Sequence, residues 1–460
     1  MTNQDTPSRR WCQFRLRTLL LVGVLCAIPF ALLGRELVRV NRDKATAAWI
    51  VEQGGDVEFS EGGLTEWIGG RVISVTFYFT ELSDLSPFKD LEALEKLNIH
   101  ESQVSDLSHL ADLRNLKEIS LYDSQVSDLA PLAKLDNLES LFLNGSPVID
   151  LSTLSNLTNL RELGLRRTQV SDLSPLARLN KLELLMAGST PVTDLSPLAG
   201  LENLQRLSLD HITTSDLSVL ADLVSLTKLT LNDMPVDDLS PLAGLAKLIQ
   251  LDLNDTQVSD LSPLAKLKNL EVLFLHGTQV SDLSTLANLP NLTMLSLGET
   301  HVSNLSPLAA LKNIAVLELG NTPVADLKPL ADLKGLYELN LDNTQVNDLS
   351  NLATLTNLTE LSLDGTRISD LLPLTGLTQF VDLRLNDTPV SDLSPLAGLR
   401  NLQNLAIRNT HVTDLSPLLG LKTLEHLSVG DSPVSDEQIR SINKTLPNCV
   451  MDRILPVVIP

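Results

Sequence analysis

The chain has 460 residues, 43% of them hydrophobic, and a formal net charge of −22. This content is enough for a large buried core, whereas an acidic chain without a basic stripe is not expected to bind nucleic acid. Three cysteines are too few for a disulfide framework.

The N-terminus combines a basic tail over residues 1–17 with an uncharged apolar run over residues 18–34. As a helix, the run spans about 26 Å, slightly less than a hydrocarbon core of about 30 Å. We interpret residues 18–34 as an uncleaved signal-anchor, the transmembrane helix of a single-pass membrane protein. A cleaved signal peptide and a buried helix are the alternatives. No small-x-small cleavage pattern follows the run, and the run lies outside the repeats described below.

The orientation of this segment is not fixed by charge, because Arg residues both precede and follow it. An N-terminal anchor ahead of a large repeat domain favours export. We therefore expect the repeats to be extracytoplasmic.

Residues 35–72 are predicted to form a linker helix, over residues 35–53, and an N-terminal cap. The ends of a repeat stack expose apolar edges that need covering. We expect Trp49, Phe59 and Trp67 to supply this cap core.

Residues 73–436 repeat with a period of 22 residues and no insertion. Such periodicity is typical of a solenoid, in which each unit packs only on its neighbours. Asn304 replaces the Asp of a V-S-D-L pattern in one of seventeen copies. The sixteen aspartates are Asp84, Asp106, Asp128, Asp150, Asp172, Asp194, Asp216, Asp238, Asp260, Asp282, Asp326, Asp348, Asp370, Asp392, Asp414 and Asp436.

Within one unit, a triplet such as Leu251-Asp252-Leu253 alternates apolar and polar residues, which predicts a short strand with one buried face. The D-L-S-P-L-A segment then turns the chain, since Asp accepts backbone N–H groups and Pro fits a first helical turn. A unit this short has room for a 3₁₀ turn but not for a full α-helix. We predict an α/β solenoid, a shallow arc with one long parallel β-sheet on the concave face and short 3₁₀ turns on the convex face.

The pattern L-x-x-L-x-L-x-x-T-x-V-x-D-L-x-P-L, which covers most of the chain, resembles the 22-residue leucine-rich repeat of bacterial internalin-type proteins. The resemblance implies a leucine-rich-repeat fold. One position departs from the family, because Thr or Ser, as at Thr256, stands where the family usually has Asn. A hydroxyl makes only part of the hydrogen-bond network that an amide makes.

The sixteen aspartates account for most of the negative charge. We expect several backbone N–H bonds to hold each of them ionised. The acidity is therefore interpreted as structural, and not as a sign of a basic partner.

Residues 437–460 are predicted to form a C-terminal cap and tail. Asp436 is expected to cap a helix over residues 437–445, with Ile439 and Ile442 facing the last repeat. A short strand should follow from Cys449.

No catalytic arrangement is found. The seven histidines lack metal-ligand spacing, the serines are repeat positions and not a nucleophile elbow, and no Gly-rich phosphate loop occurs. We therefore predict no enzyme activity, no catalytic residue, no metal, no cofactor and no small-molecule substrate.

Outward positions on the sheet are the residue before each L-x-L triplet, its middle residue and the residue after it. Most are polar, but two groups are not. One group comes from three adjacent units and contains Val272, Phe274, His276, Met294 and Val316. The other contains Tyr122, Phe142, Leu184 and Met186, with Arg166 and Arg167 beside it. Such side chains are typical of interface anchors, although scattered exposed apolar residues are also tolerated on any surface.

The sequence thus predicts a membrane-anchored scaffold that binds a protein partner through the concave sheet face. Docking would be rigid, with little loss of conformational entropy. The alternatives are a structural envelope or surface spacer without a specific ligand, and an intracellular regulatory subunit.

Overall fold

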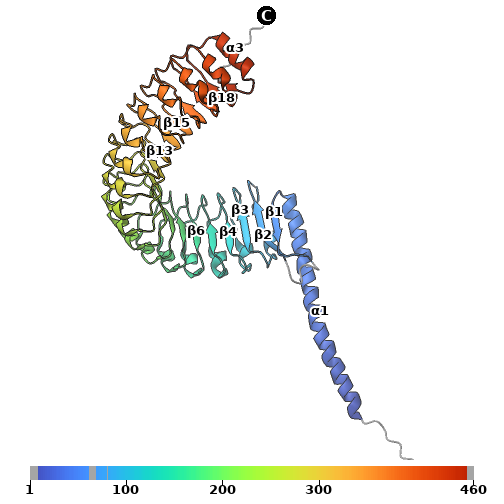
Figure 1. Ribbon diagram of the computed structural model, residues 1–460. Coiled ribbons are helices and arrows are strands. Elements are labelled where there is room, and N and C mark those ends of the chain that lie inside the picture. Colours follow the sequence, from blue (N-terminus) through green and yellow to red (C-terminus); the bar gives the residue numbers. More distant parts are fainter. Residues whose placement is uncertain (1–8, 62–68, 80, 453–460) are drawn as a thin grey trace, which may run out of the picture. The chain divides into compact units, whose positions relative to one another are not determined.

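The computed structural model describes residues 9–61, 69–79 and 81–452. They belong to two compact units, which divide between Gly164 and Leu165. In both units, a short strand on one side of each repeat is followed by a 3₁₀ turn on the other side (Figure 1). We call these two sides the sheet face and the turn side.

The first unit contains the long helix α1 and the strands that follow it. Strand β1 pairs antiparallel with β2, and the later strands pair parallel with their predecessors. The elements are α1 (Arg9–Glu52), β1 (Asp56–Phe59), β2 (Val72–Phe77), η1 (Ser86–Phe88), β3 (Lys96–Ile99), η2 (Ser108–Leu110), β4 (Glu118–Ser120), η3 (Ala130–Lys134), β5 (Ser140–Phe142), η4 (Ser152–Asn156) and β6 (Glu162–Gly164).

The second unit continues the same alternation, and all of its recorded strand pairings are parallel. Its strands are β7 (Leu184–Met186), β8 (Arg206–Ser208), β9 (Lys228–Thr230), β10 (Gln250–Asp252), β11 (Val272–Phe274), β12 (Met294–Ser296), β13 (Val316–Glu318), β14 (Glu338–Asn340), β15 (Glu360–Ser362), β16 (Asp382–Arg384), β17 (Asn404–Ala406), β18 (His426–Ser428) and β19 (Val450–Met451). Its helical segments are η5 (Ser174–Arg178), η6 (Ser196–Leu198), η7 (Ser218–Asp222), η8 (Ser240–Gly244), η9 (Ser262–Lys266), η10 (Ser284–Asn288), η11 (Ser306–Ala310), η12 (Lys328–Leu330), η13 (Ser350–Leu352), η14 (Leu372–Leu374), η15 (Ser394–Gly398), η16 (Ser416–Gly420) and α3 (Asp436–Thr445).

The strand register follows the repeat, so that Leu251 pairs with Leu273 on the next strand. Leu251, Leu253 and Leu264 are all 0% exposed, which places the core between the sheet and the 3₁₀ turns. The predicted leucine-rich-repeat solenoid, with parallel strands and short 3₁₀ turns, is confirmed.

Two kinds of side chain satisfy backbone groups in the turns. Buried Thr256 donates from Oγ1 to the carbonyl of Leu253 at 2.6 Å, a bond within one unit. Asn269 donates from Nδ2 to the carbonyl of Ala246 at 2.8 Å, and this bond joins adjacent units. The same bond, 23 residues back along the chain, is made by Asn115, Asn137, Asn159, Asn203, Asn291, Asn313, Asn357 and Asn401.

The repeated aspartates are held differently from our prediction. Asp260 accepts one backbone N–H, from Ser262 at 2.8 Å, and the hydroxyl of the same serine at 2.8 Å. The expectation of several N–H bonds was wrong, because the turn brings only the N–H two residues ahead within reach. The backbone bond and then the hydroxyl bond lower the pKa of Asp260, which therefore stays ionised.

A left-handed residue recurs every 22 positions, from Phe79 to Asp431, just beyond the sheet face. Most of these positions hold Asp, Asn or Gly, which adopt this conformation at the least cost. The exceptions include Phe79 and Glu101, both with φ of 50°.

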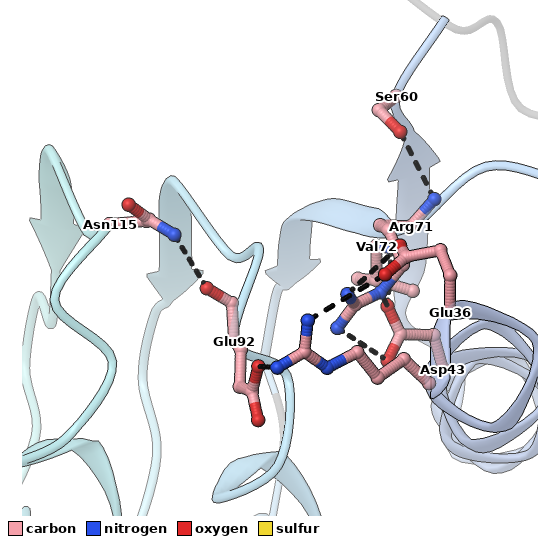
Figure 2. A network of polar contacts seen from close by, with 8 residues as sticks. Glu36, Asp43, Ser60, Arg71, Val72, Glu92 and Asn115 are labelled. Carbon is pink, nitrogen blue, oxygen red and sulfur yellow. Dashed lines mark hydrogen bonds and ion pairs between the residues drawn. The ribbon is translucent and has the colours of Figure 1, made fainter. Parts of the chain in front are cut away.

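The N-terminal cap contains a buried ion pair. Asp43 on α1 is 0% exposed and Arg71 is 7% exposed. Arg71 Nε donates to Asp43 Oδ2 at 2.7 Å, and the Val72 N–H donates to the same oxygen at 3.0 Å (Figure 2). Burial would lower the pKa of Arg71, but Asp43 and Glu36 outweigh it and raise that pKa, so the guanidinium stays charged.

The cap core is smaller than predicted. Trp49 meets Phe88 edge-on, with ring centroids 6.1 Å apart. Phe59 is 39% exposed and lies outside this core, and Trp67 lies outside the described residues.

Helix α1 joins the predicted membrane segment and linker helix into one element. Within the described part of the chain, no helix is long and apolar enough to cross a membrane. The predicted membrane segment over residues 18–34 is thus not supported. Many of its side chains, including those of residues 18–23, lie outside the described ones.

At the C-terminus, Ile439 and Ile442 of α3 are buried, as expected. The helix is capped by Ser435 and not by Asp436. Ser435 has an extended backbone, which lets its Oγ accept the N–H of Gln438 at 3.3 Å, whereas Asp436 is already the first helical residue.

Candidate interaction surface on the sheet face

The outward positions on the sheet face form rows that run across the strands. Val272 on β11 pairs with Met294 on β12, which pairs with Val316 on β13. Leu273, between Val272 and Phe274, is 0% exposed, whereas its two neighbours are half-buried. Strand alternation therefore separates core from surface here as predicted from the sequence.

The five residues of the first predicted group lie on the sheet face of the second unit, and four of them are accessible. His276 follows β11, and a Cβ at Gly298 would come within 2.7 Å of its Nδ1, so the imidazole lies against that glycine. Val316 is only 5% exposed. Its row neighbours Met294 and Glu338 have longer side chains, which explains why a residue at an outward position is covered.

The same row becomes acidic beyond Val316. Glu338, Glu360 and Asp382 follow one another on β14, β15 and β16. Burial raises the pKa of Glu338, and the nearby charges of Glu360 and Glu318 raise it further. The apolar strip of the second unit therefore ends against a row of carboxylates.

The second predicted group is divided between the two units. Tyr122 and Phe142 belong to the first unit, where their rings stack with centroids 5.9 Å apart and planes at 14°. They continue a longer series, because His100 meets Tyr122 at 5.0 Å and Tyr78 at 5.3 Å, both edge-on. We call Tyr78, His100, Tyr122 and Phe142 the aromatic row.

Sequence reasoning missed Tyr78 and His100. Both occupy the outward position that Tyr122 occupies one or two repeats later, so the same rule, applied from β2 onward, would have found them. Gly164 helps to seat the row, since a Cβ there would come 2.7 Å from the Phe142 ring.

Burial favours the uncharged forms of His100 and Tyr122 in the aromatic row. Burial lowers the pKa of His100, although the charges of Asp123 and Glu101 act to raise it. Its Nε2 lies 2.9 Å from Ser120 Oγ. Burial raises the pKa of Tyr122. The charge of Glu162 raises this pKa further, whereas a hydrogen bond with Asn144 acts to lower it.

The remaining members of the second group belong to the second unit. Arg166, Leu184 and Met186 line a hollow of about 410 Å³ on the sheet face. Arg166 Nη2 lies 3.4 Å from Asp210 Oδ2, and Leu184 is 9% exposed. Arg167 is exposed at a left-handed position, with φ of 57°, and does not line the hollow.

Sequence reasoning also missed the other charged side chains of this hollow. Arg206, Lys228 and Asp252 line it, and burial raises the pKa of Asp252. They are outward residues on consecutive strands, but most outward positions are polar, so these residues did not stand out in the sequence. Among the residues that the structure describes, no group of three or more His, Cys, Asp or Glu could hold a metal ion.

Comparison with known proteins shows the family to which the chain belongs. The model of leucine-rich repeats in two copies matches residues 246–288 and 268–310. The crystal structure of an internalin from Listeria monocytogenes is 31% identical, over 63% of this chain and 86% of that chain, with a TM-score of 0.60. The chain belongs to the internalin-type leucine-rich-repeat proteins.

Other similar structures agree on the fold of this internalin-type protein. A leucine-rich-repeat protein of Leptospira interrogans is 25% identical over 82% of this chain and 95% of that chain, with a TM-score of 0.68. The plant peptide hormone receptor RGFR1, in complex with RGF2, is 17% identical over 79% and 67%, with a TM-score of 0.59, and shares the fold alone. The search of curated proteins gives no match.

Proposed function

We propose that this protein is a non-catalytic scaffold that binds a protein partner through its sheet face. The observation that carries the proposal is the aromatic row, in which ring contacts run without a break from Tyr78 to Phe142. Tyr78 is 59% exposed, and large aromatic side chains on an exposed face are the residues that most often anchor interfaces.

The scaffold would dock as a rigid body. Its strands are hydrogen-bonded to neighbours 22 residues away on either side, so few backbone angles remain to be fixed on binding. Little conformational entropy is then lost when a partner is bound. A rigid surface of this kind suits a partner that already has a complementary shape, or an extended segment that adapts to it.

The test is photo-crosslinking in cells. A photoreactive phenylalanine analogue would replace Tyr78 on the sheet face or, as a matched control, Lys266 on the turn side. We expect a protein adduct from position 78 that position 266 does not give. A structural spacer without a specific ligand would give no adduct that depends on the face, and that outcome would refute the proposal.

The two predicted groups are proposed as contact regions for the partner. In the first unit they comprise Tyr122 and Phe142, and in the second unit Val272, Phe274, His276, Met294, Val316, Arg166, Arg167, Leu184 and Met186. A Phe274→Ser, Met294→Ser variant tests the apolar strip, with Gln257→Ala as an exposed control. An unchanged set of crosslinked proteins in the double variant would remove this strip from the proposal.

A separate proposal concerns location. The uncharged run over residues 18–34 supports a membrane anchor with an extracytoplasmic repeat domain, although no helix among the described residues is long and apolar enough to span a membrane. Carbonate extraction and protease treatment of intact cells test it. A repeat domain that is protected from protease in intact cells, and is released from membranes by carbonate, would instead favour the intracellular regulatory subunit.

A further inference from the structure

The aromatic row is unusual for the composition of this chain. Tyr78 and Tyr122 are two of only three tyrosines, and aromatic residues make up 3% of the sequence. The core of the repeats is filled by leucine, at 0% exposure through most of the stack. Phe77 and Phe88 are buried in the first unit, but packing of the interior does not account for the rings on the sheet face, which need another explanation.

Phe79, the residue after Tyr78, is held at an energetic cost. It is 78% exposed and has a φ of 50°. A bulky side chain in the left-handed region is strained, and such strain tends to occur at functional sites. Later repeats place Asp, Asn or Gly at many of the equivalent positions. An exposed side chain that is both strained and apolar gains nothing from the fold itself.

Acidic groups surround these rings. The charges of Asp123 and Glu101 act on His100, and the charge of Glu162 acts on Tyr122. Lys96, on the same face, pairs with Glu118, with Nζ 3.4 Å from Oε2. The face of an aromatic ring is itself electronegative. Rings and carboxylates together make this part of the surface attractive to cations.

An unused acceptor points to the same ligand chemistry. Asn98 Oδ1 is buried and has no hydrogen-bond partner among the described residues. Asn98 lies on β3, paired with Thr76 on β2 and Ser120 on β4, at the middle of the row. A buried acceptor without a donor is costly, so a ligand that brings an N–H group would satisfy it.

We propose that the aromatic row, with Phe79, binds a basic segment of the protein partner. Arg or Lys side chains lie over the ring faces, and their N–H groups reach the surrounding carboxylates and Asn98. Arginine fits best because its planar guanidinium stacks on rings and carries five donors. A basic segment complements the negative charge of these carboxylates, whereas the same charge would repel an acidic segment. This inference rests on the proposed function and specifies the chemistry of the partner.

The test measures binding of labelled peptides to the full chain by fluorescence anisotropy. Three extended peptides of equal length carry arginine, citrulline or glutamate at alternate positions. Citrulline keeps the size and planarity of arginine without its charge. Two cation–π contacts predict that the arginine peptide binds about fivefold to thirtyfold more tightly than the citrulline peptide, while the glutamate peptide binds most weakly.

Variants separate the row from the general attraction of an acidic protein. Tyr78→Ser with Tyr122→Ser should remove most of the preference for arginine, whereas Tyr78→Phe with Tyr122→Phe keeps the rings and should retain it. In the second unit, Tyr337→Ser removes a tyrosine that is 44% exposed. Glu338→Gln with Glu360→Gln removes charge from an acidic row without rings. Both controls should leave the preference for arginine unchanged.

Equal binding of the arginine and citrulline peptides would overturn the proposal, and so would a double serine variant that behaves like the controls. If the citrulline peptide binds as well as arginine but still requires the tyrosine rings, the row docks an apolar segment and only the basic chemistry fails. The photo-crosslinks from position 78 test the proposed function independently, since they require no assumption about charge.

Discussion

On the turn side, the same contacts recur from repeat to repeat. Asn269 and its equivalents donate to the preceding unit, and Asp260 and its equivalents accept the N–H of the residue two positions ahead. On the sheet face, the outward positions change, from His100 and Tyr122 in the first unit to Phe274 in the second. A position that repeats its contact holds the stack together. A position without a repeated contact is able to vary, and binding is expected there.

The largest loss of stability is expected from mutation of the N-terminal cap, because the cap contains a buried ion pair. Asp43→Ala would leave the buried Arg71 guanidinium with only the more distant Glu36 as a carboxylate partner, and we expect a loss of about 3–5 kcal/mol in the free energy of unfolding. Urea denaturation followed by circular dichroism measures this loss. Glu36→Gln is the control, since Glu36 lies 3.4 Å from Arg71 and is more exposed, and it should cost less. Equal losses in the two variants would contradict our account of the cap.

Adjacent residues of β11 test the comparison directly. Leu273→Ala should cost about 2–5 kcal/mol, because it opens a cavity in the core. Phe274→Ser should cost about 1 kcal/mol or less, as is usual for side chains at the surface, but should change the crosslinked proteins. Thermal denaturation and the crosslinking assay separate the two effects. If Phe274→Ser proved as destabilising as Leu273→Ala, Phe274 would belong to the core.

The asparagines of the turn side have a smaller effect each. Asn269→Ala removes one bond between units, and we expect a loss of about 0.5–1.5 kcal/mol. Gln257→Ala, at an exposed position, is the control. A variant of Asn269 that unfolds at the same urea concentration as the control would show that these bonds are dispensable.

The smallest single effect concerns the aspartates. Ser262→Ala removes the hydroxyl bond to Asp260, so the pKa of Asp260 should rise toward its ordinary value of 3.8. The carboxyl resonance of Asp260, followed by NMR during an acid titration, measures this shift. A pKa that stays as low as in the parent protein would mean that the backbone N–H alone is sufficient.

Acid should destabilise the whole solenoid through the same residues. Their folded-state pKa values are lowered, so their contribution to stability is complete above the ordinary value of 3.8 and is lost as the pH falls through the lowered values. The effect of one exposed carboxylate is small, but it recurs along the row. If the melting temperature did not decrease at pH values below 3.8, this expectation would be contradicted.

The sequence predicts the fold well because one grid of leucines repeats without interruption. Pairs such as Leu251 and Leu273 can only be buried together if their strands lie side by side. Two features were missed, although the sequence signals each of them. The Asn of the L-x-N-L pattern indicates the asparagine bonds between units. The Asp, Asn or Gly that precedes Thr256 and its equivalents indicates the left-handed positions.

The candidate surface was predicted only in part. Alternation gives the direction of a side chain, so Phe274 and Met294 were placed on the correct face. Alternation does not give exposure, which depends on neighbouring strands, and Val316 is therefore covered despite its outward position. Tyr78 and His100 lie within the predicted repeats, and they were missed because the rule for outward positions was not applied to the residues that follow β2 and β3.

The left-handed column offers a route to engineering heat resistance. A residue other than Gly, Asn or Asp in this conformation stores roughly 1–3 kcal/mol of strain. Ser189 and Glu299, which are not among the proposed contact residues, adopt it with φ of 57°. Their replacement by glycine or asparagine would relieve that strain without touching a single leucine. Phe79 and Glu101 are the exceptions, because replacing them would raise thermal stability but weaken the proposed binding of a ligand.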